Sequence, residues 1–331
     1  MPNKKNTTFD RHGGYATPSG SIASQKHCCN LNKIKLLGDF ERNQVCEVPP
    51  KPKPKYESTN PHTRLYVDDC RNILPAISDE ETVDLIFADP PFNWDVHYDG
   101  WEDNMPRSVY ERFTFDWLDC CVNALSPTGS IWVNIPDDTA AEVVIHLKRR
   151  GLTMINWCVW HFRFGQHRDS SFIMSKVHAL YFVKDPAKRT WNGDSILEQS
   201  DRASIYNDKR TQTKEKNKGM RVPMDVWYGK YWGRIQGNNQ ERRSGHHNQI
   251  PEVYLERVVL ACSNEGDLVL DPFAGSGTTG TVAREHGRKS ISIEQSEKNA
   301  KSAWERISSV GMIRKGNSTG QSSAIFGKRK K

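Results

Sequence analysis

A glycine-rich segment spanning residues 267–281 carries the first indication of chemistry in this chain. It reads Asp-Leu-Val-Leu-Asp-Pro-Phe-Ala-Gly-Ser-Gly-Thr-Thr-Gly-Thr. The strand-like residues 268–271 lead into Gly275 and Gly277, which let the backbone turn sharply and approach a ligand with no Cβ in the way. A helix-like stretch, 278–286, follows, and the N–H groups at its start can bind polar or anionic ligand atoms. The pattern predicts a nucleotide-type cofactor site at the carboxyl end of a parallel strand.

Three cofactor classes can be compared at this turn. Residues 275–280 satisfy the dinucleotide fingerprint G-x-G-x-x-G, and Glu294 follows at about the expected distance. Asp271, however, would repel a pyrophosphate at the mouth of the turn and attract a cationic ammonium group. A Walker phosphate loop is disfavoured because Thr281 follows the last glycine and no lysine comes after it. S-adenosylmethionine fits better, because it carries an ammonium, a sulfonium and a ribose that Glu294 can bind, and no phosphate.

A second segment, Asp-Pro-Pro-Phe at 89–92, follows the apolar stretch 83–88. Consecutive prolines cannot continue a central strand, so the backbone here is expected to be stiff and extended. The carboxylate of Asp89, the carbonyl of Pro90 and the ring of Phe92 would then form a rigid pocket for a flat amine. On its own, this segment is better interpreted as an ordinary proline-rich strand exit.

Together the two segments resemble the motifs of the amino-methyltransferases that modify exocyclic amines of DNA bases. Residues 89–92 resemble the family's catalytic motif and residues 271–279 its cofactor motif. The catalytic motif comes first, which is the permuted order of the β class. The resemblance spans residues 63–310 and implies an α/β, Rossmann-like methyltransferase fold. This fold has a mostly parallel seven-stranded sheet, helices on both faces and an inserted target-recognition region.

The resemblance also implies roles for individual residues. The segment 68–70 resembles the one that meets the cofactor's adenine, and 246–251 resembles the family segment His-Pro-x-Gln-x-Pro at the methionine end. His247 stands where proline is usual, so a contact from His246 or His247 stays open. The expected catalytic residues are Asp89, Pro90, Pro91 and Phe92. The expected cofactor-binding residues are Asp69, Cys70, Asp89, Gln249, Pro251, Asp271, Phe273, Ala274, Gly275, Ser276, Gly277, Thr278, Thr279, Glu294 and Gln295.

The resemblance implies a direct, in-line methyl transfer. An exocyclic amine is a poor nucleophile because its lone pair is delocalised into the ring. Asp89 and the Pro90 carbonyl would accept the two N–H groups of the amine while Phe92 stacks on the base, so positioning and charge stabilisation would do most of the catalysis. Because the amine lies inside a duplex, the base would have to be flipped out. No Pro-Cys dipeptide is present for the covalent chemistry of carbon-5 cytosine methylation.

Asp at the first motif position and Phe at the fourth favour N6 of adenine, with N4 of cytosine as the alternative. An RNA or protein-glutamine methyltransferase is a further alternative, although the glutamine enzymes characteristically carry Asn at position 89. The remaining alternatives are an NAD dehydrogenase and a non-enzymatic DNA-binding protein whose methylase core has decayed. The intact motif residues disfavour such decay; they are Asp89, Pro90, Phe92, Asp271 and Gly275. The expected partner is double-stranded DNA. A cognate restriction endonuclease and a homodimer are further candidates, between which the sequence does not decide.

The hydrophobic pattern predicts the elements that position these motifs. The predicted strands are 65–67, 83–88, 130–135, 154–163, 177–183, 268–271 and 290–294. The predicted helices are a brief one following residues 68–70, then 109–125, 139–150, 252–262 and 278–286. The predicted parts of the chain are a basic, partly disordered N-terminal extension (1–60), a catalytic half (61–184), a target-recognition region (185–245), a cofactor-binding half (246–310) and a basic disordered tail (311–331).

Charge distribution supports the assignment of the central region. Between residues 188 and 243 there are 13 Lys and Arg residues and seven acidic ones, with six Trp and Tyr residues interleaved. Basic and aromatic side chains suit contacts to phosphates and bases, whereas a solvated insertion explains the composition equally well. Position in the β-class order favours DNA recognition.

Overall composition excludes several classes of protein. The hydrophobic content is 36%, the mean hydropathy is −0.73, and no apolar run approaches the ~20 residues of a membrane span. Eight cysteines show neither C-x-x-C nor zinc-ligand spacing, so reduced thiols and no metal site are expected. The N-terminus lacks the apolar core of a secretory signal. These features predict a cytoplasmic, nucleoid-associated protein, and the net charge of +7 permits a polyanionic partner.

Overall fold

The computed structural model describes residues 51–96, 100–162, 167, 169–213, 217–229, 232–233, 235, 241–243 and 249–311. All the described residues belong to one compact unit. The predictions for residues 1–50, for His246 and His247 and for the tail 312–331 lie outside the described residues.

The sequence predicted five of the seven α-helices in the described part of the chain, whereas those at Asp201–Ser204 and Glu297–Ser309 were not predicted. Two of the helices begin at side chains that cap them. Asp69 accepts a hydrogen bond from the backbone N–H of Arg71 at the start of α1, and Ser296 accepts one from Asn299 at the start of α7. The helices are α1 (Cys70–Glu80), α2 (Arg107–Ala124), α3 (Asp137–Arg149), α4 (Asp201–Ser204), α5 (Glu252–Cys262), α6 (Thr278–Glu285) and α7 (Glu297–Ser309), with short 3-10 turns at Gly193–Ile196 and Lys209–Gln212. None of the helices in the described part of the chain combines the length and apolarity of a bilayer span.

The main sheet has nine strands in the order β1-β2-β11-β10-β3-β4-β6-β5-β9. Its strands are β1 (Tyr56–Thr59), β2 (His62–Val67), β3 (Val83–Ala88), β4 (Leu125–Ile135), β5 (Thr153–His161), β6 (Lys176–Val183), β9 (Val226–Trp227), β10 (Leu268–Asp271) and β11 (Lys289–Glu294), and β7 (Glu198–Gln199) pairs separately with β8 (Met220–Arg221). Five of its eight pairings are parallel, so a mostly parallel α/β sheet is confirmed. The expected count of seven is corrected to nine, because β1 and β9 extend the two edges.

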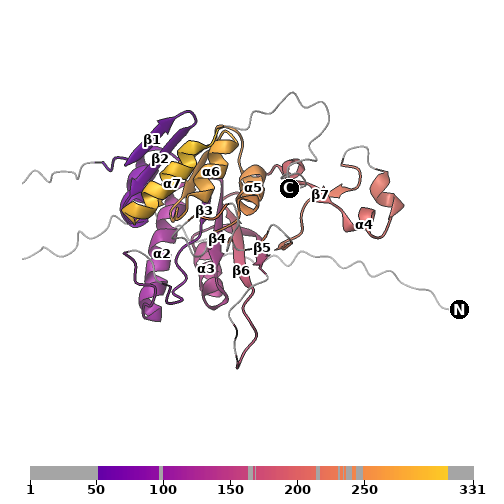
Figure 1. Cartoon of the computed structure of the whole chain (residues 1–331), viewed down its shortest axis with the longest axis horizontal. Helices are drawn as coiled ribbons and strands as arrows, with labels where there is room; N and C mark the ends of the chain where they lie inside the picture. Colours follow the sequence, from indigo (N-terminus) through magenta and orange to yellow (C-terminus); the bar gives the residue numbers. More distant parts are fainter. Residues whose placement is uncertain are drawn as a thin grey trace, which may run out of the picture. The chain divides into compact units, whose positions relative to one another are not determined.

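Helices cover both faces of the sheet (Figure 1). The side chains of β3 alternate between these two faces. Ile86 and Ala88 belong to the cluster formed with α1, α2 and α3. Leu85 and Phe87 belong to the cluster formed with α5 and α6. Both sets of side chains are apolar, because a strand that is covered by helices on both faces has no exposed side for polar residues.

The chain order creates a crevice between β3 and β10. From β3 the chain crosses through α2 to β4, and from β10 it crosses through α6 to β11 on the opposite side and face. The two strands are neighbours and parallel, so both end at the same edge of the sheet. Ligands bind at such a switch point in open α/β sheets. The expectation that the two motifs meet at one edge is therefore confirmed.

The boundary predicted at residue 60 differs from the structure. Tyr56–Thr59 forms β1 and pairs antiparallel with β2, so the hairpin spans the boundary expected at residue 60. The sequence pattern missed this strand because the Pro-Lys run at 49–55 immediately before it is typical of a linker.

Candidate active site

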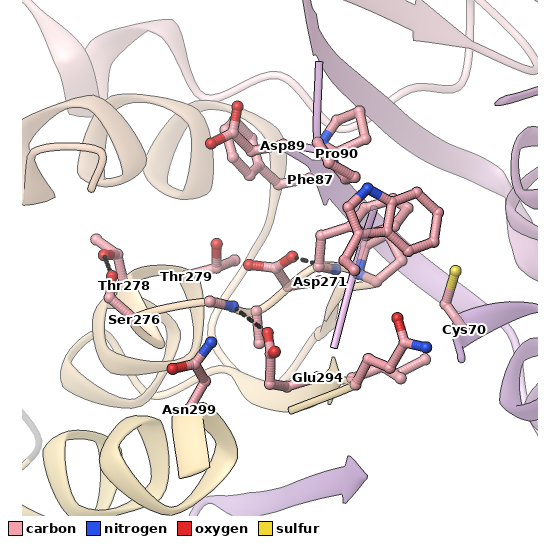
Figure 2. Close-up of a pocket in the computed structure, with 18 of the residues that line it drawn as sticks. Cys70, Phe87, Asp89, Pro90, Asp271, Ser276, Thr278, Thr279, Glu294 and Asn299 are labelled. Atoms are coloured by element: carbon pink, nitrogen blue, oxygen red, sulfur yellow. Dashed lines mark hydrogen bonds between the residues drawn. The ribbon is translucent and has the colours of Figure 1, made fainter. Parts of the chain in front are cut away.

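A cavity of about 470 Å³ lies where β3 and β10 end. In Figure 2 Asp89 and Pro90 lie at the top of this cavity, with Asp271 in the middle and Glu294 below. All the residues predicted to act in catalysis or cofactor binding line the cavity, except Pro251 and Gly277. The structure therefore brings the two motifs, about 180 residues apart in sequence, into one site.

The catalytic turn is held by side chains from other elements. Asn134 on β4 donates a hydrogen bond through Nδ2 to Oδ1 of Asp89 at 3.1 Å. The hydroxyl of Tyr110 on α2 donates to the carbonyl of Pro91 at 2.9 Å. The second contact uses the carbonyl of Pro91 within the protein. The neighbouring carbonyl of Pro90 is the one expected to accept an N–H group of the substrate amine.

The loop that follows the catalytic turn is organised around one buried carboxylate. Asp103, which is 4% exposed, accepts hydrogen bonds from the backbone N–H groups of Asn93 (2.8 Å), Trp94 (2.9 Å) and Val96 (3.1 Å). Asn93 also has a positive φ of 59°, which asparagine tolerates better than most residues. Asp103 thereby fixes the chain direction immediately after Phe92.

The cofactor turn begins at a buried carboxylate. Asp271 accepts a hydrogen bond from the backbone N–H of Phe273 at 2.9 Å and is 5% exposed. Burial raises the pKa of Asp271 to about 6, and the nearby Glu294 adds to the rise. A cationic group beside Asp271 would therefore stabilise its ionised form strongly.

Glu294 connects the end of β11 to the glycine turn. Its carboxylate accepts the backbone N–H of Gly275 at 2.9 Å (Figure 2). It also accepts the backbone N–H of Ser296 at 3.0 Å. It lines the cavity together with Gln295. Carboxylate oxygens have further lone pairs, so these contacts leave Glu294 able to accept from ribose hydroxyls.

The two glycines of the turn have different surroundings. Gly275 has φ +48°, lines the cavity and would place a Cβ no closer than 3.9 Å to another heavy atom. Gly277 has φ +74°, and its Cβ would lie 3.0 Å from the Cβ of Ala303 on α7. Gly277 is therefore required by close helix packing at the start of α6, and it does not line the cavity.

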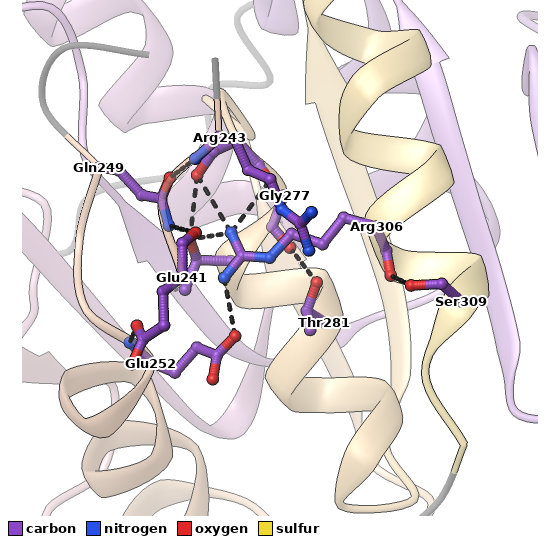
Figure 3. Close-up of polar contacts among 10 residues, drawn as sticks. Glu241, Arg243, Gln249, Glu252, Gly277, Thr281, Arg306 and Ser309 are labelled. Carbon is purple, nitrogen blue, oxygen red and sulfur yellow. Dashed lines mark hydrogen bonds and ion pairs between the residues drawn. The ribbon is translucent and has the colours of Figure 1, made fainter. Parts of the chain in front are cut away.

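Arg306 supports the back of the glycine turn and was not predicted from the sequence. Its buried guanidinium donates to the carbonyl of Ser276 (3.2 Å) and the hydroxyl of Thr278 (2.9 Å). It also donates to the carboxylate of Glu252 at 2.9 Å (Figure 3). The signal in the sequence is an arginine on the apolar face of α7. Burying such a residue requires acceptors for its charge, and Ser276, Thr278 and Glu252 supply them for the two terminal nitrogens.

Gln249 lines the cavity but uses its amide to hold neighbouring backbone. Its Nε2 donates to the carbonyl of Glu241 at 2.6 Å, and its Oε1 accepts from the backbone N–H of Arg243 at 3.0 Å (Figure 3). Pro251 lies outside the cavity lining, where it precedes the first residue of α5. These residues shape the end of the site from behind.

The cavity lining suits S-adenosylmethionine. Asp271 and Glu294 offer carboxylates to its ammonium, sulfonium and ribose groups, and Phe273 and Ile293 provide apolar walls. The sequence did not point to several other lining residues, because nothing in their local pattern marks them. These are Phe87, Phe113, Leu255, Lys298 and Asn299.

The predicted target-recognition region divides its aromatic residues between core and surface. Trp227 and Trp232 are buried and pack against α5, so the expectation that they contact DNA is corrected. Tyr206 and Tyr228 are 75% and 60% exposed. Tyr231 lies outside the described residues.

Comparison with known proteins identifies the family. The model of a DNA methylase family that modifies N6 of adenine or N4 of cytosine matches residues 83–305. The chain is 36% identical to the DNA adenine methyltransferase YhdJ of Escherichia coli (strain K12) over 239 residues, covering 69% of this chain and 76% of YhdJ. It is 30% identical over 243 residues to the type II methyltransferase M.HpaI of Haemophilus parainfluenzae, covering 72% of this chain and 73% of M.HpaI.

Among solved structures, the PvuII DNA methyltransferase, described as cytosine-N4-specific, has the same fold. Its TM-score is 0.58 at 17% identity, and the match covers 77% of this chain and 89% of PvuII methyltransferase. The chain therefore belongs to the S-adenosylmethionine-dependent DNA methylases of the N6-adenine/N4-cytosine family.

Proposed function

We propose that this methylase transfers the methyl group of S-adenosylmethionine to N6 of an adenine flipped out of duplex DNA. The observation that carries the proposal is that Asp89 and the glycine turn at Gly275 line one cavity. A carboxylate that can accept an amine N–H thus lies in the same space as residues that suit the cofactor.

The preference for adenine rests on the catalytic motif and on one relative. The motif has Asp89 at its first position and Phe92 at its fourth, the combination that the family resemblance associates with adenine. The 36% identical relative YhdJ is named as an adenine methyltransferase. N4-methylation of cytosine is the alternative outcome of the same chemistry.

Asp89, Pro90 and Phe92 have separate tasks in this proposal. Bound S-adenosylmethionine supplies a methyl group activated by the positive sulfonium. Asp89 and the Pro90 carbonyl accept the two N–H groups of the amine, which holds the nitrogen in place and stabilises the positive charge that it gains. Phe92 offers its ring to the base and is itself supported edge-on by Trp94, with ring centroids 5.1 Å apart.

The cofactor is assigned to the other side of the cavity. Asp271 holds the ammonium group, and Glu294 accepts from the ribose hydroxyls. Asp69, Cys70 and Gln295 surround the adenine. These roles follow from the chemistry of the residues that line the cavity together.

The enclosure of Asp89 supports base flipping. The carboxylate lies inside the cavity and is partly buried, whereas the amine of a paired base lies within the helix stack. An enzyme that modifies such an atom must act on an extrahelical base. We propose that exposed cations of the 185–245 region, including Arg202 and Arg210, bind the phosphates around it.

The decisive experiment identifies the methylated product. Purified full-length protein is incubated with S-adenosylmethionine labelled in the methyl group and with duplex DNA of random sequence, single-stranded DNA or RNA. The DNA is then digested to nucleosides and separated by mass spectrometry. Label in N6-methyladenine from the duplex supports the proposal. Label in N4-methylcytosine selects the alternative base, and label only in RNA would refute DNA as the substrate.

A further inference from the structure

Two buried side chains continue inward from the proposed catalytic carboxylate. Asn134 and Tyr254 are both fully buried, on β4 and α5 respectively. The Tyr254 hydroxyl lies 2.6 Å from Oδ1 of Asn134, and Nδ2 of Asn134 lies 3.1 Å from Oδ1 of Asp89. Residues 120 positions apart thus meet end to end behind the catalytic turn.

The chemistry of the three groups fixes the direction of these hydrogen bonds. An ionised carboxylate only accepts, so the atom of Asn134 that faces Asp89 must be its NH₂ group. The other end of the amide is then an oxygen, which requires a donor. Burial raises the pKa of Tyr254 well above its ordinary value, so its hydroxyl keeps its proton and supplies that donor.

The tyrosine ring is in turn fixed by aromatic packing. It stacks on Trp160 with ring centroids 5.5 Å apart, and it meets Phe87 edge-on at 5.6 Å. Trp227, from the predicted target-recognition region, packs against it at 5.0 Å. A ring held on several sides presents its hydroxyl in one place, so the position of the Asn134 amide is defined by the core.

We propose that Asn134 and Tyr254 are positioning residues that set the orientation of the Asp89 carboxylate for the substrate amine. The proposal rests on the proposed function, in which Asp89 accepts an N–H of the target base. Tyr254 prevents the Asn134 amide from turning its oxygen towards Asp89, and Asn134 prevents the carboxylate from rotating. Because a small misplacement of a reacting group lowers the rate strongly, the effect falls on turnover and not on binding.

The test compares single and double variants by steady-state kinetics on duplex DNA. Asn134→Ala is expected to lower kcat on the order of 10²-fold, and Tyr254→Phe about tenfold, with KM for DNA and Kd for the cofactor near wild type. If Tyr254 acts through Asn134, adding Tyr254→Phe to Asn134→Ala lowers kcat no further. Multiplication of the two single effects would refute the relay.

An isosteric variant separates positioning from packing. Asn134→Asp preserves shape but turns a carboxylate towards Asp89, so it should be at least as inactive as Asn134→Ala. The pH at which its kcat rises should also be higher than in wild type, since two facing carboxylates resist ionisation. If Asn134→Asp is nearly as active as wild type, the hydrogen bond to Asp89 has no role. Tyr181→Phe, which removes a buried hydroxyl from β6, is the matched control and should leave kcat unchanged.

Asp89→Ala is measured in the same series to separate two kinds of failure. If Asp89→Ala is inactive while Asn134→Ala and Tyr254→Phe have wild-type kcat, the positioning role is wrong and the proposed function stands. If Asp89→Ala retains wild-type kcat, the proposed function itself is wrong. Tyr254→Phe keeps the packed ring, so it tests the proposal even if Asn134→Ala does not fold.

Discussion

The catalytic turn and the cofactor turn lie side by side but are stabilised in different ways. The catalytic turn at 89–92 is held by the side chains of Asn134 and Tyr110, which come from a neighbouring strand and a helix. The cofactor turn at 271–279 also has outside support, from Glu294 and Arg306. Unlike the catalytic turn, it has in addition a conformation set by its own sequence, through Gly275 and the hydrogen bond from Phe273 to Asp271.

This difference separates two sources of precision. A turn built from glycines and local hydrogen bonds carries its conformation in the motif itself. A turn built from two prolines is stiff, but its direction depends on what the rest of the fold places around it. Substitutions at the two turns should therefore have separable effects. Those in the catalytic turn should lower turnover, and those in the cofactor turn should weaken cofactor binding.

The largest expected effect follows from removing the carboxylate of the catalytic turn. Asp89→Ala should lower kcat by more than about 10³-fold, because the amine loses a preorganised acceptor. Its Kd for S-adenosylmethionine, measured by isothermal calorimetry, should stay near wild type. Asp84→Ala, at the opposite end of β3, is the control. Loss of cofactor binding together with turnover would show that the two turns do not divide these tasks.

The complementary change is made at the cofactor turn. Asp271→Asn keeps the side-chain size but removes the charge that would pair with the ammonium group. The Kd for the cofactor should rise on the order of 10²-fold, as when one member of a buried charge pair is removed. Turnover at saturating cofactor should change much less. Equal cofactor affinity in Asp271→Asn and wild type would contradict the assigned contact.

The pH dependence of cofactor affinity provides a finer test of the same contact. Because the pKa of Asp271 is raised to about 6 in the protein without cofactor, binding a cation below pH 6 must release a proton. Affinity should therefore be level above pH 6 and fall about tenfold per pH unit below it. The dependence should disappear in Asp271→Asn. A level profile in the wild type would show that Asp271 stays neutral on binding.

The same raised pKa has an opposite consequence for the unliganded fold. Burial favours the protonated form of Asp271, so its contribution to the free energy of unfolding is fully present below the unfolded value of 3.8. That contribution is lost as the pH rises through about 6 and amounts to about 3 kcal/mol. Asp271 therefore reduces stability at neutral pH while it prepares the site for a cation.

The sequence predicted the parts of the fold whose signals are local. The bounds of β3, β10 and α5 agree with the prediction residue by residue, because each is a compact apolar run ended by turn residues or a cap. The strand β9 was missed, since two residues form no pattern of their own and their pairing with β5 depends on tertiary contact.

The same limit applies to the site. The residues of both motifs were predictable because their types and spacing are unusual. Arg306 and Asn134 were not, because an arginine in a helix and an asparagine in an apolar strand have no functional spacing. Their positions follow from packing between elements far apart in sequence, through hydrogen bonds to Thr278 and Asp89.

The smallest expected effect concerns the glycine that supports the cofactor turn from outside the cavity. Gly277→Ala places a side chain at φ +74° and 3.0 Å from Ala303, whereas Gly151→Ala imposes a similar φ of +85° in open space. Positive φ alone costs roughly 1–2 kcal/mol, so Gly151→Ala should lose about that much unfolding free energy in urea. Gly277→Ala should lose more, because the backbone of α7 must also move, and its cofactor Kd should rise only a few-fold. If the two variants lose the same stability, the approach of α6 to α7 does not require glycine, and Gly277 would instead belong with Gly275 in shaping the cofactor site.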